Sequence, residues 1–214
     1  MINLTDWQSI DYNVALEKQE EVFNRQILNK KQNMPTENTL FFCSHPHVYT
    51  VGKSGNMGNM LLDDGSVPVI RTNRGGDITY HGPGQIVGYP IFDLESLGIG
   101  LKDYIHKIET AIICTLAHYN IKSKQLSGAT GVWLDIDNPA RCRKICAIGV
   151  RSSRFVTMHG FALNVNTDLS YFNKINPCGF TDKGVTSMSA ELGHHIDEEI
   201  VKKLLFEKIT FVFS

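Results

Sequence analysis

The chain has 214 residues, of which 42% are hydrophobic and 20% charged, as in an ordinary globular protein. Its 21 basic side chains nearly balance its 22 acidic ones, which excludes a protein that binds nucleic acid or an anionic membrane through its overall charge. No apolar run approaches the roughly 18 residues of a membrane span, and the N-terminus does not resemble a signal peptide, so we expect a cytoplasmic protein.

Hydrophobic periodicity and turn residues divide the chain into helices and strands. A helix is predicted over residues 9–33, with Ser9 or Asp11 as its cap. The remaining elements, in chain order, are strands at 39–44, 48–51, 67–72, 78–80 and 86–92, a helix at 101–119, strands at 131–134, 144–151 and 156–166, and a helix from 197 to about 208. Because the strands cluster instead of alternating with helices, we expect one α+β domain over residues 1–214, with mixed or antiparallel sheets. The polar stretch 120–143 is interpreted as a loop.

The cysteines indicate neither a disulfide framework nor a zinc site. Their number is odd and no C-x-x-C pair occurs. Cys142 and Cys146, with His159 downstream, lack the further ligands that structural zinc requires, so we expect no metal. Cys43, Cys114 and Cys146 lie in apolar stretches and are interpreted as inert core residues.

The densest unusual chemistry lies in the segment 74–85, RGGDITYHGPGQ, where five of twelve residues are Gly or Pro. This segment interrupts a β-rich stretch, in which glycine weakens pairing unless the backbone needs a positive φ or must admit something close. Two interpretations stay open from the residues alone. The segment is either a glycine-rich turn in which His81 is a satisfied polar group, or a loop that a ligand approaches, with Arg74, Tyr80 and His81 around it.

Two further segments carry a cation and an accessible thiol. KICAIGV at 144–150 reads as a buried strand that starts with Lys144, whose side chain would by default lie at the exposed end of the strand. INPCG at 175–179 places Cys178 between Pro177 and Gly179, a turn that leaves the sulfur outside the core and near free backbone N–H groups.

These segments together resemble the lipoyl(octanoyl) transferase family. The resemblance rests on RGGDITYHGPGQ followed by Tyr89-Pro90, on KICAIG, HGFALNVN and INPCG in that order, and on SHPHVYTVGKSG at 44–55, and it spans about residues 40–190. It implies a biotin/lipoyl protein ligase-like fold and transfer of an octanoyl group from acyl carrier protein to a lysine of lipoyl domains. The acceptors it implies are the lipoyl domains of 2-oxoacid dehydrogenase complexes and the glycine cleavage H protein, with no cofactor.

The resemblance also implies the roles of particular residues. Cys178 would be the nucleophile that carries the acyl group as a thioester, and Lys144 would be its partner. The substrate-lining residues carried over are Arg74, Gly75, Gly76, Asp77, Ile78, Thr79, Tyr80, His81, Ala147, Ile148, Gly149, Gly160, Phe161 and Ala162. Phe161 departs from the leucine expected in many members, and we expect its bulkier ring to reshape the acyl slot.

Three alternatives to this function are kept. The first is an ATP-dependent lipoate or biotin ligase on the same fold, which would not need Cys178. The second is a thiol hydrolase or amidase that pairs Cys178 with His81 or His159. The third is an acyl-binding module without enzymatic activity.

An acidic carrier protein requires a basic surface on its partner. The candidates for that surface are the cations that cluster in sequence near residues 120–154, which are Lys122, Lys124, Arg141, Arg143, Arg151 and Arg154. The alternative is that these side chains form an ordinary solvated face.

Overall fold

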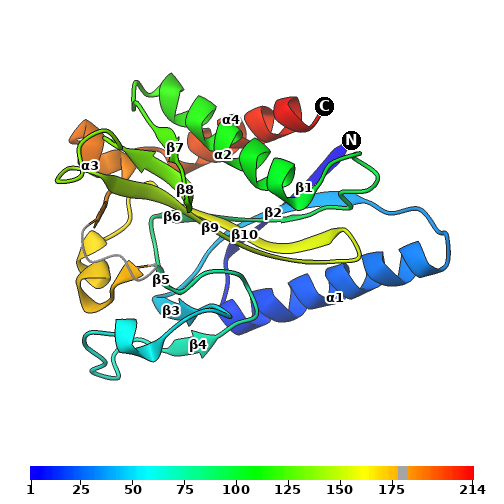
Figure 1. Cartoon of the computed structure of the whole chain (residues 1–214), viewed down its shortest axis with the longest axis horizontal. Helices are drawn as coiled ribbons and strands as arrows, with labels where there is room; N and C mark the ends of the chain where they lie inside the picture. The colour runs from blue at the N-terminus through cyan, green and yellow to red at the C-terminus, as the bar shows by residue number, and fades with distance from the viewer. Residues whose placement is uncertain (178–182) are drawn as a thin grey trace.

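The computed structural model describes residues 1–177 and 183–214, and two sheets and four α-helices account for most of them (Figure 1). The first half of the described chain contains β1 (Ile2–Ser9), α1 (Tyr12–Lys31), β2 (Asn38–Ser44), β3 (Val48–Val51), the 3-10 helix η1 (Met57–Asn59), β4 (Val69–Arg71), β5 (Ile78–His81) and β6 (Gln85–Ile91). The second half contains α2 (Leu101–His118), β7 (Lys124–Leu126), β8 (Ala129–Leu134), β9 (Arg143–Ser153), β10 (Val156–Asn164), the 3-10 helix η2 (Leu169–Lys174), β11 (Gly184–Val185), α3 (Met188–Leu192) and α4 (Glu198–Phe213).

The large sheet has the strand order β1-β2-β6-β10-β9-β8-β7, and β11 pairs with β9. The pairs β1–β2 and β9–β11 are parallel, and the other pairs are antiparallel. The small sheet has the order β4-β3-β5. Mixed sheets packed with helices make this an α+β fold, as the clustering of strands in the sequence predicts.

Helices cover the large sheet on both faces. α2 and α4 pack against one face, and α1 runs along the other (Figure 1). The main apolar core lies under α2 and α4, and a second cluster, which includes Phe23, Phe41 and Met158, lies between the sheet and α1. A third cluster around Tyr80 joins the small sheet to η2. The small sheet therefore lies on the α1 side of the large one, and the candidate site forms between them.

The predicted helices and most predicted strands are present, with three differences. The sequence did not predict β1, because its side chains are mostly exposed at the edge of the sheet and give no alternating apolar pattern. α1 begins only at Tyr12, because the Asp11 carboxylate accepts hydrogen bonds from the backbone N–H groups of Asn13 and Val14 and caps the helix there. α4 continues to Phe213 instead of ending near residue 208.

The interpretation of 120–143 as a loop is wrong. This stretch contains β7 and β8, which pair as a hairpin, and β8 extends the large sheet beside β9. Its buried residues include Val132 and Leu134, which belong to the main apolar core, whereas the polar Lys124 and Gln125 that suggested a loop lie in β7.

Candidate active site

The principal cavity lies between the glycine segment, the strands β9 and β10, and the start of α1. It encloses about 490 Å³ of space not filled by atoms, part of it open to solvent. Twelve of the predicted substrate-lining residues surround it: Arg74, Gly76, Asp77, Ile78, Thr79, His81, Ala147, Ile148, Gly149, Gly160, Phe161 and Ala162. Tyr12, Val87, Tyr89 and His159 complete the lining.

Two residues of the predicted set lie elsewhere. Tyr80 is fully buried in the small-sheet core, where its ring stacks on Tyr171 and its hydroxyl is 2.6 Å from Nδ1 of His47. Gly75 lines another hollow, which shares Gly76, Asp77, Ile148 and Gly149 with the principal cavity and which Lys144 and residues 128–130 also line.

A second, smaller hollow continues from the principal cavity toward Lys144. It shares Thr79, Ala147 and Ala162 with that cavity, and its other lining residues are Gln85, Lys144, Asn164, Phe172, Pro177 and Val185. The fold therefore brings Lys144 to one hollow with Pro177, the residue directly before Cys178. Cys178 itself lies outside the described residues.

Lys144 is buried, so the default interpretation of an exposed strand end is wrong. Its side chain is 7% exposed, and its ammonium lies 4.5 Å from the centroid of the Trp133 ring on β8. Gly131 on β8 lies next to this side chain, and a Cβ there would lie 2.6 Å from the carbonyl oxygen of Cys146, so the pairing of β8 with β9 requires glycine at this position. A cation enclosed by an aromatic face and kept from water acts strongly on any charge that forms nearby.

Arg74 holds the glycine segment in place. Its guanidinium is buried and donates hydrogen bonds to the backbone carbonyls of Thr50, Gly75 and Asp77 at 2.8, 3.0 and 2.7 Å. The backbone N–H of Gly75 donates to the carbonyl of Val150 on β9 at 2.9 Å. Gly76 has a φ of +85°, which glycine adopts without strain, and the loop is thereby fixed on β9.

Asp77 connects the glycine segment to the chain that precedes Cys178. Its carboxylate accepts hydrogen bonds from the backbone N–H of Asn56 at 3.0 Å and from Nδ2 of Asn59 at 2.5 Å. The carbonyl of Asn59 then accepts the backbone N–H of Asn176 at 2.8 Å. Asp77 therefore positions η1, and η1 positions the residues next to Pro177.

His81 is part of a buried polar chain that ends beside Lys144. Its Nδ1 is 2.8 Å from Oε1 of Gln85, and Nε2 of Gln85 donates to Oδ1 of Asn164 at 2.9 Å. Nδ2 of Asn164 donates to the carbonyl of Thr186, whose N–H donates to the carbonyl of Lys144. Burial, with neighbouring His45 and Arg74, lowers the pKa of His81 to about 3. His81 is therefore neutral at physiological pH and held as a structural link.

His159 lines the principal cavity and is also neutral. Burial, with the charges of Arg74 and Arg151, lowers its pKa to about 3. Its Nε2 lies 2.6 Å from Oδ1 of Asn73.

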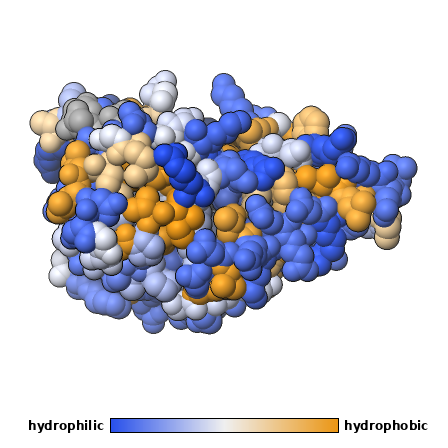
Figure 2. Space-filling view, turned by 90° about the horizontal axis from the view of Figure 1, so that it is seen from below, coloured by the Kyte–Doolittle hydropathy of each residue, from blue (hydrophilic) through white to orange (hydrophobic). Residues whose placement is uncertain are grey.

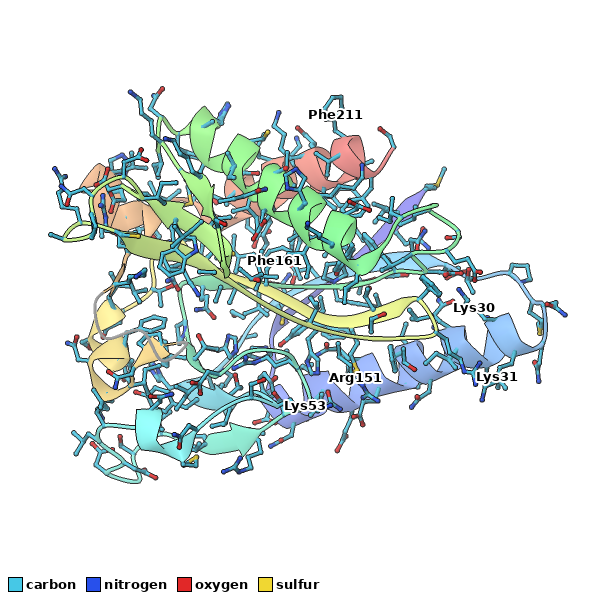
Figure 3. All side chains as sticks on the ribbon, viewed as in Figure 1. Lys30, Lys31, Lys53, Arg151, Phe161 and Phe211 are labelled. Carbon is cyan, nitrogen blue, oxygen red and sulfur yellow. The ribbon has the colours of Figure 1, made fainter. Side chains whose placement is uncertain are left out.

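Gly160 borders the cavity as expected, whereas the expected effect of Phe161 needs correction. A Cβ on Gly160 would lie 2.1 Å from the carbonyl oxygen of Gly88, so the neighbouring strand β6 requires glycine at this position. The Phe161 ring belongs to the core on the α2 and α4 face, where it crosses Gly88 and packs edge-on against Phe42 (Figure 3). Phe161 borders the cavity, but its ring is packed in the core, so we do not expect its bulk to reshape the slot.

The other cysteines differ from one another. Cys43 and Cys146 are buried as predicted, and burial raises the pKa of both thiols. Cys114 is exposed, so its interpretation as a core residue is wrong. Within residues 1–177 and 183–214, no group of three His, Cys, Asp or Glu side chains could hold a metal ion, and no helix is long and apolar enough to cross a membrane.

The predicted basic surface is divided. Lys124 pairs with Asp137, Arg141 pairs with Asp135, and Arg143 pairs with both Asp135 and Glu191. Half of the six candidate cations are therefore neutralised by acids of the same region. Arg151 instead lies over the Phe23 ring at 5.1 Å, on the α1 side of the sheet, where Figure 3 also shows Lys53.

Sequence reasoning missed several residues that build the site. Tyr12 and Val87 line the cavity, and Gln85, Asn164 and Thr186 form the polar chain. Gln85 lies in the glycine segment and Asn164 in HGFALNVN. Two amide side chains within these otherwise apolar segments could have indicated a buried hydrogen-bond network. Tyr12 lies at a helix start far from them in sequence, and no local pattern places it there.

Comparison with known proteins identifies the family. Residues 11–210 match the model of the lipoyl protein ligase A/B catalytic domain. The chain belongs to this family. It is 57% identical over 214 residues to the octanoyltransferase of Parabacteroides distasonis, covering 98% of this chain and 97% of that protein.

Solved structures of this family and of biotin ligases share the fold. A bipartite lipoate protein ligase studied with its E2 lipoyl domain, from Thermoplasma acidophilum, has a TM-score of 0.68 at 13% identity and covers 98% of this chain and 82% of its own. Biotin protein ligase from Aquifex aeolicus, in complex with biotin and ATP, has a TM-score of 0.57 at 13% identity. The match covers 99% of this chain and 70% of that one. The predicted biotin/lipoyl ligase-like fold is confirmed.

Proposed function

We propose that this protein transfers an octanoyl group from the thioester of acyl carrier protein to a lysine of lipoyl domains, with Cys178 as nucleophile. The acceptors we propose are the lipoyl domains of 2-oxoacid dehydrogenase complexes and the glycine cleavage H protein. The observation that carries the proposal is the hollow that buried Lys144 and Pro177 line together, which shares Thr79, Ala147 and Ala162 with the principal cavity. We place the reaction in the cytoplasm, where a reducing environment keeps a nucleophilic thiol free.

The first step is a thioester exchange. The Cys178 thiolate attacks the octanoyl carbonyl, a carbon–sulfur bond to the enzyme forms, and the carrier thiolate leaves and takes a proton. A thiolate performs this exchange readily, and a free cysteine is only a few per cent ionised near neutral pH. An ammonium about 4 Å from the sulfur would contribute roughly 4 kcal/mol at an effective dielectric of 20, enough to lower a thiol pKa by up to about 3 units. We assign that ammonium to Lys144.

The second step is aminolysis. The acceptor lysine amine attacks the acyl-enzyme carbonyl, an amide bond forms, and the Cys178 thiolate leaves. We propose that the leaving carrier thiolate takes its proton from the Lys144 ammonium in the first step. Lys144 is then a neutral amine, and it accepts the proton that the attacking nitrogen loses in the second step. Lys144 also lines the hollow bordered by Gly75 and the turn 128–130, which gives the acceptor lysine a second approach to it.

The principal cavity holds the acyl tail in this proposal. Burial of roughly seven methylenes at about 0.8 kcal/mol each gives about 5 kcal/mol before the chain pays its ordering cost. Ile78, Val87 and Ala162 supply apolar lining. Exclusion of water from the slot protects the acyl-enzyme from hydrolysis.

The thioester mechanism is favoured over the alternatives by specific observations. His81 and His159 each have a pKa of about 3, which makes them weak bases, and they are bonded to Gln85 and Asn73, so neither suits the general base of a thiol hydrolase. The ligase alternative rests on structural likeness at 13% identity, whereas a protein named octanoyltransferase is 57% identical.

Intact mass spectrometry tests the proposal directly. Incubation with octanoyl-carrier protein, without ATP, should add about 126 Da to the chain, mapped to Cys178. Cys178→Ala should abolish both the adduct and transfer to a lipoyl domain. A requirement for ATP with free octanoate would establish the ligase instead, and release of free octanoate without transfer would establish the hydrolase.

Lys144 has a separate test based on thiolate formation. Lys144→Ala should slow transfer and raise the pH at which iodoacetamide alkylates Cys178, because the neighbouring cation is lost. The measurement uses a Cys114→Ser background, since Cys114 is the exposed cysteine among the described ones. An unchanged alkylation profile in Lys144→Ala would remove Lys144 from the mechanism.

A further inference from the structure

Trp133 is held in one position beside Lys144. The two residues are partners in the antiparallel register of β8 and β9, so their side chains are direct cross-strand neighbours. Trp133 is 1% exposed, and its indole Nε1 donates a hydrogen bond to the carbonyl of Ala129 at 3.0 Å. The ammonium of Lys144 lies over the indole ring, 4.5 Å from the ring centroid. A lysine side chain, which is flexible by itself, therefore has a fixed neighbour on the next strand.

An aromatic ring stabilises the charge of Lys144 without opposing it. The face of the ring attracts a cation, and this attraction is strongest where water is excluded. A carboxylate would also stabilise the ammonium, but its negative charge would oppose the field that the ammonium exerts on a nearby thiolate. The indole ring has no net charge. The contact with Trp133 therefore leaves the positive charge of Lys144 available to a neighbouring sulfur.

The titratable groups near Lys144 include two acids and a thiol. Asp77 lines one hollow with Lys144, and its carboxylate accepts hydrogen bonds from two asparagines of the η1 segment. Glu109 on α2 accepts the N–H of Gly131 at 2.9 Å, and burial raises its pKa. Burial also raises the pKa of the Cys146 thiol, and the charge of Lys144 acts in the opposite direction. Both acids thus have donors of their own, and the field of Lys144 reaches a neighbouring sulfur.

We propose that Trp133 is a positioning residue for the transfer reaction, and that its ring holds Lys144 in place as an ammonium while the Cys178 thiolate forms and attacks. In this role Trp133 acts through Lys144 and not on the acyl group. The ring also favours the second step, because Lys144 regains its charge when it takes the proton of the acceptor amine. This inference rests on the proposed function, since it takes Lys144 to be the partner of the thiolate.

Replacement of the ring by an unbranched apolar side chain tests the proposal. In the Cys114→Ser background, Trp133→Met should slow alkylation of Cys178 by iodoacetamide about 10-fold at pH 7, because the ammonium loses the attraction of the ring. The rate at a pH at which every thiol is ionised should not change. In octanoyl transfer, kcat should fall with little change in KM. Trp133→Phe keeps an aromatic face that binds cations less strongly, and it should slow alkylation only about 2-fold.

A double-mutant cycle shows whether Trp133 acts through Lys144. In Lys144→Met protein, Trp133→Met should have no further effect on alkylation of Cys178. The inference is overturned if the slowing is the same with and without Lys144, or if a folded Trp133→Met protein is alkylated like the wild type. If Trp133→Met does not fold, Trp133→Phe takes its place in the cycle. Its smaller slowing must then be present with Lys144 and absent without it.

Phe155→Leu is the matched control for these variants. The Lys30 ammonium lies over the Phe155 ring, 5.9 Å from the centroid, in the turn between β9 and β10 and away from the two hollows that Lys144 lines. Loss of this ring should leave alkylation of Cys178 and octanoyl transfer unchanged.

Octanoyl transfer by the wild type separates the two levels of the proposal. If the wild type does not transfer octanoyl to a lipoyl domain, the proposed function fails. If it does, and the variants of Trp133 do not respond as expected, only the assignment of Trp133 fails.

Discussion

At the scale of single residues, the site keeps its histidines neutral. His45, His81 and His159 are buried, and burial lowers the pKa of each below its usual value. His45 and His81 meet edge to face, with 5.9 Å between ring centroids, so a charge on one would disfavour a charge on the other. Protonation would place a charge in a buried site, and the fold therefore resists it.

This arrangement predicts a loss of stability in mild acid. The folded pKa of His81 and of His159 is about 3, against about 6.5 in the unfolded chain, so below pH 6.5 the unfolded state binds more protons. The stabilisation is complete above pH 6.5 and is lost as the pH falls toward 3, by up to about 1.4 kcal/mol per pH unit for each histidine.

Urea unfolding between about pH 7.5 and 5.5 measures this slope, because carboxylates titrate mainly below that window. His194→Gln should retain the full slope, since His194 is exposed. A free energy of unfolding that does not change over this range would show that the buried rings are protonated in the folded state.

At the scale of elements, the glycine segment supports the residues directly before Cys178. The connection between β3 and β4 is attached to Asp77 at η1 and to the end of η2 through the hydrogen bond from Leu61 N–H to the Lys174 carbonyl. Figure 2, viewed from the side of the small sheet, shows apolar side chains gathered on this end of the surface. Exposed residues of the connection include Met57, Leu61 and Leu62.

Asp77→Ala should therefore impair the turn more than the slot. Loss of its carboxylate frees Asn56 and Asn59, and the carbonyl of Asn59 then holds Asn176 less firmly. We expect kcat for octanoyl transfer to fall about 10-fold with little change in KM, and alkylation of Cys178 to slow.

Asp63→Ala is the control for Asp77→Ala, because Asp63 lies on the same connection and accepts only the local N–H of Gly65 among the described contacts. A higher KM with normal Cys178 alkylation would instead make Asp77 a substrate-binding residue.

Much of the site could be predicted from contiguous segments. The glycine segment and the strand segments AIG and GFA border one cavity because β9 and β10 are neighbours in antiparallel register. Tyr12 and Gln19 could not be predicted, because only the packing of α1 on β10 brings them there. The sequence analysis wrongly assigned Cys114 to the core, because α2 buries only the side of the helix that includes Ala111, Ile112 and Thr115.

At the scale of the whole molecule, the two apolar clusters on opposite faces of the large sheet are built on the same strands. β6 and β10 contribute Ile86 and Leu163 to the cluster under α2 and α4, and Val87 and Ala162 to the cluster under α1. Both faces therefore depend on the same central strands, and loss of one face exposes the other.

We predict that residues 1–214 unfold as one cooperative domain. Calorimetry should give a single transition with equal calorimetric and van't Hoff enthalpies and a heat-capacity change of about 3 kcal/mol/K for a chain of this length. Two separable transitions, or a stable proteolytic fragment lacking the small sheet, would contradict the single-domain prediction.

The way Arg74 is used has a consequence for inhibition. Its guanidinium already serves three backbone carbonyls of the small sheet and glycine segment. A fatty acid carboxylate could recruit this cation only by taking donors from those carbonyls and loosening the loop that forms the slot wall. Free octanoate should therefore compete poorly with the uncharged thioester, and other free fatty acids should leave transfer unimpeded.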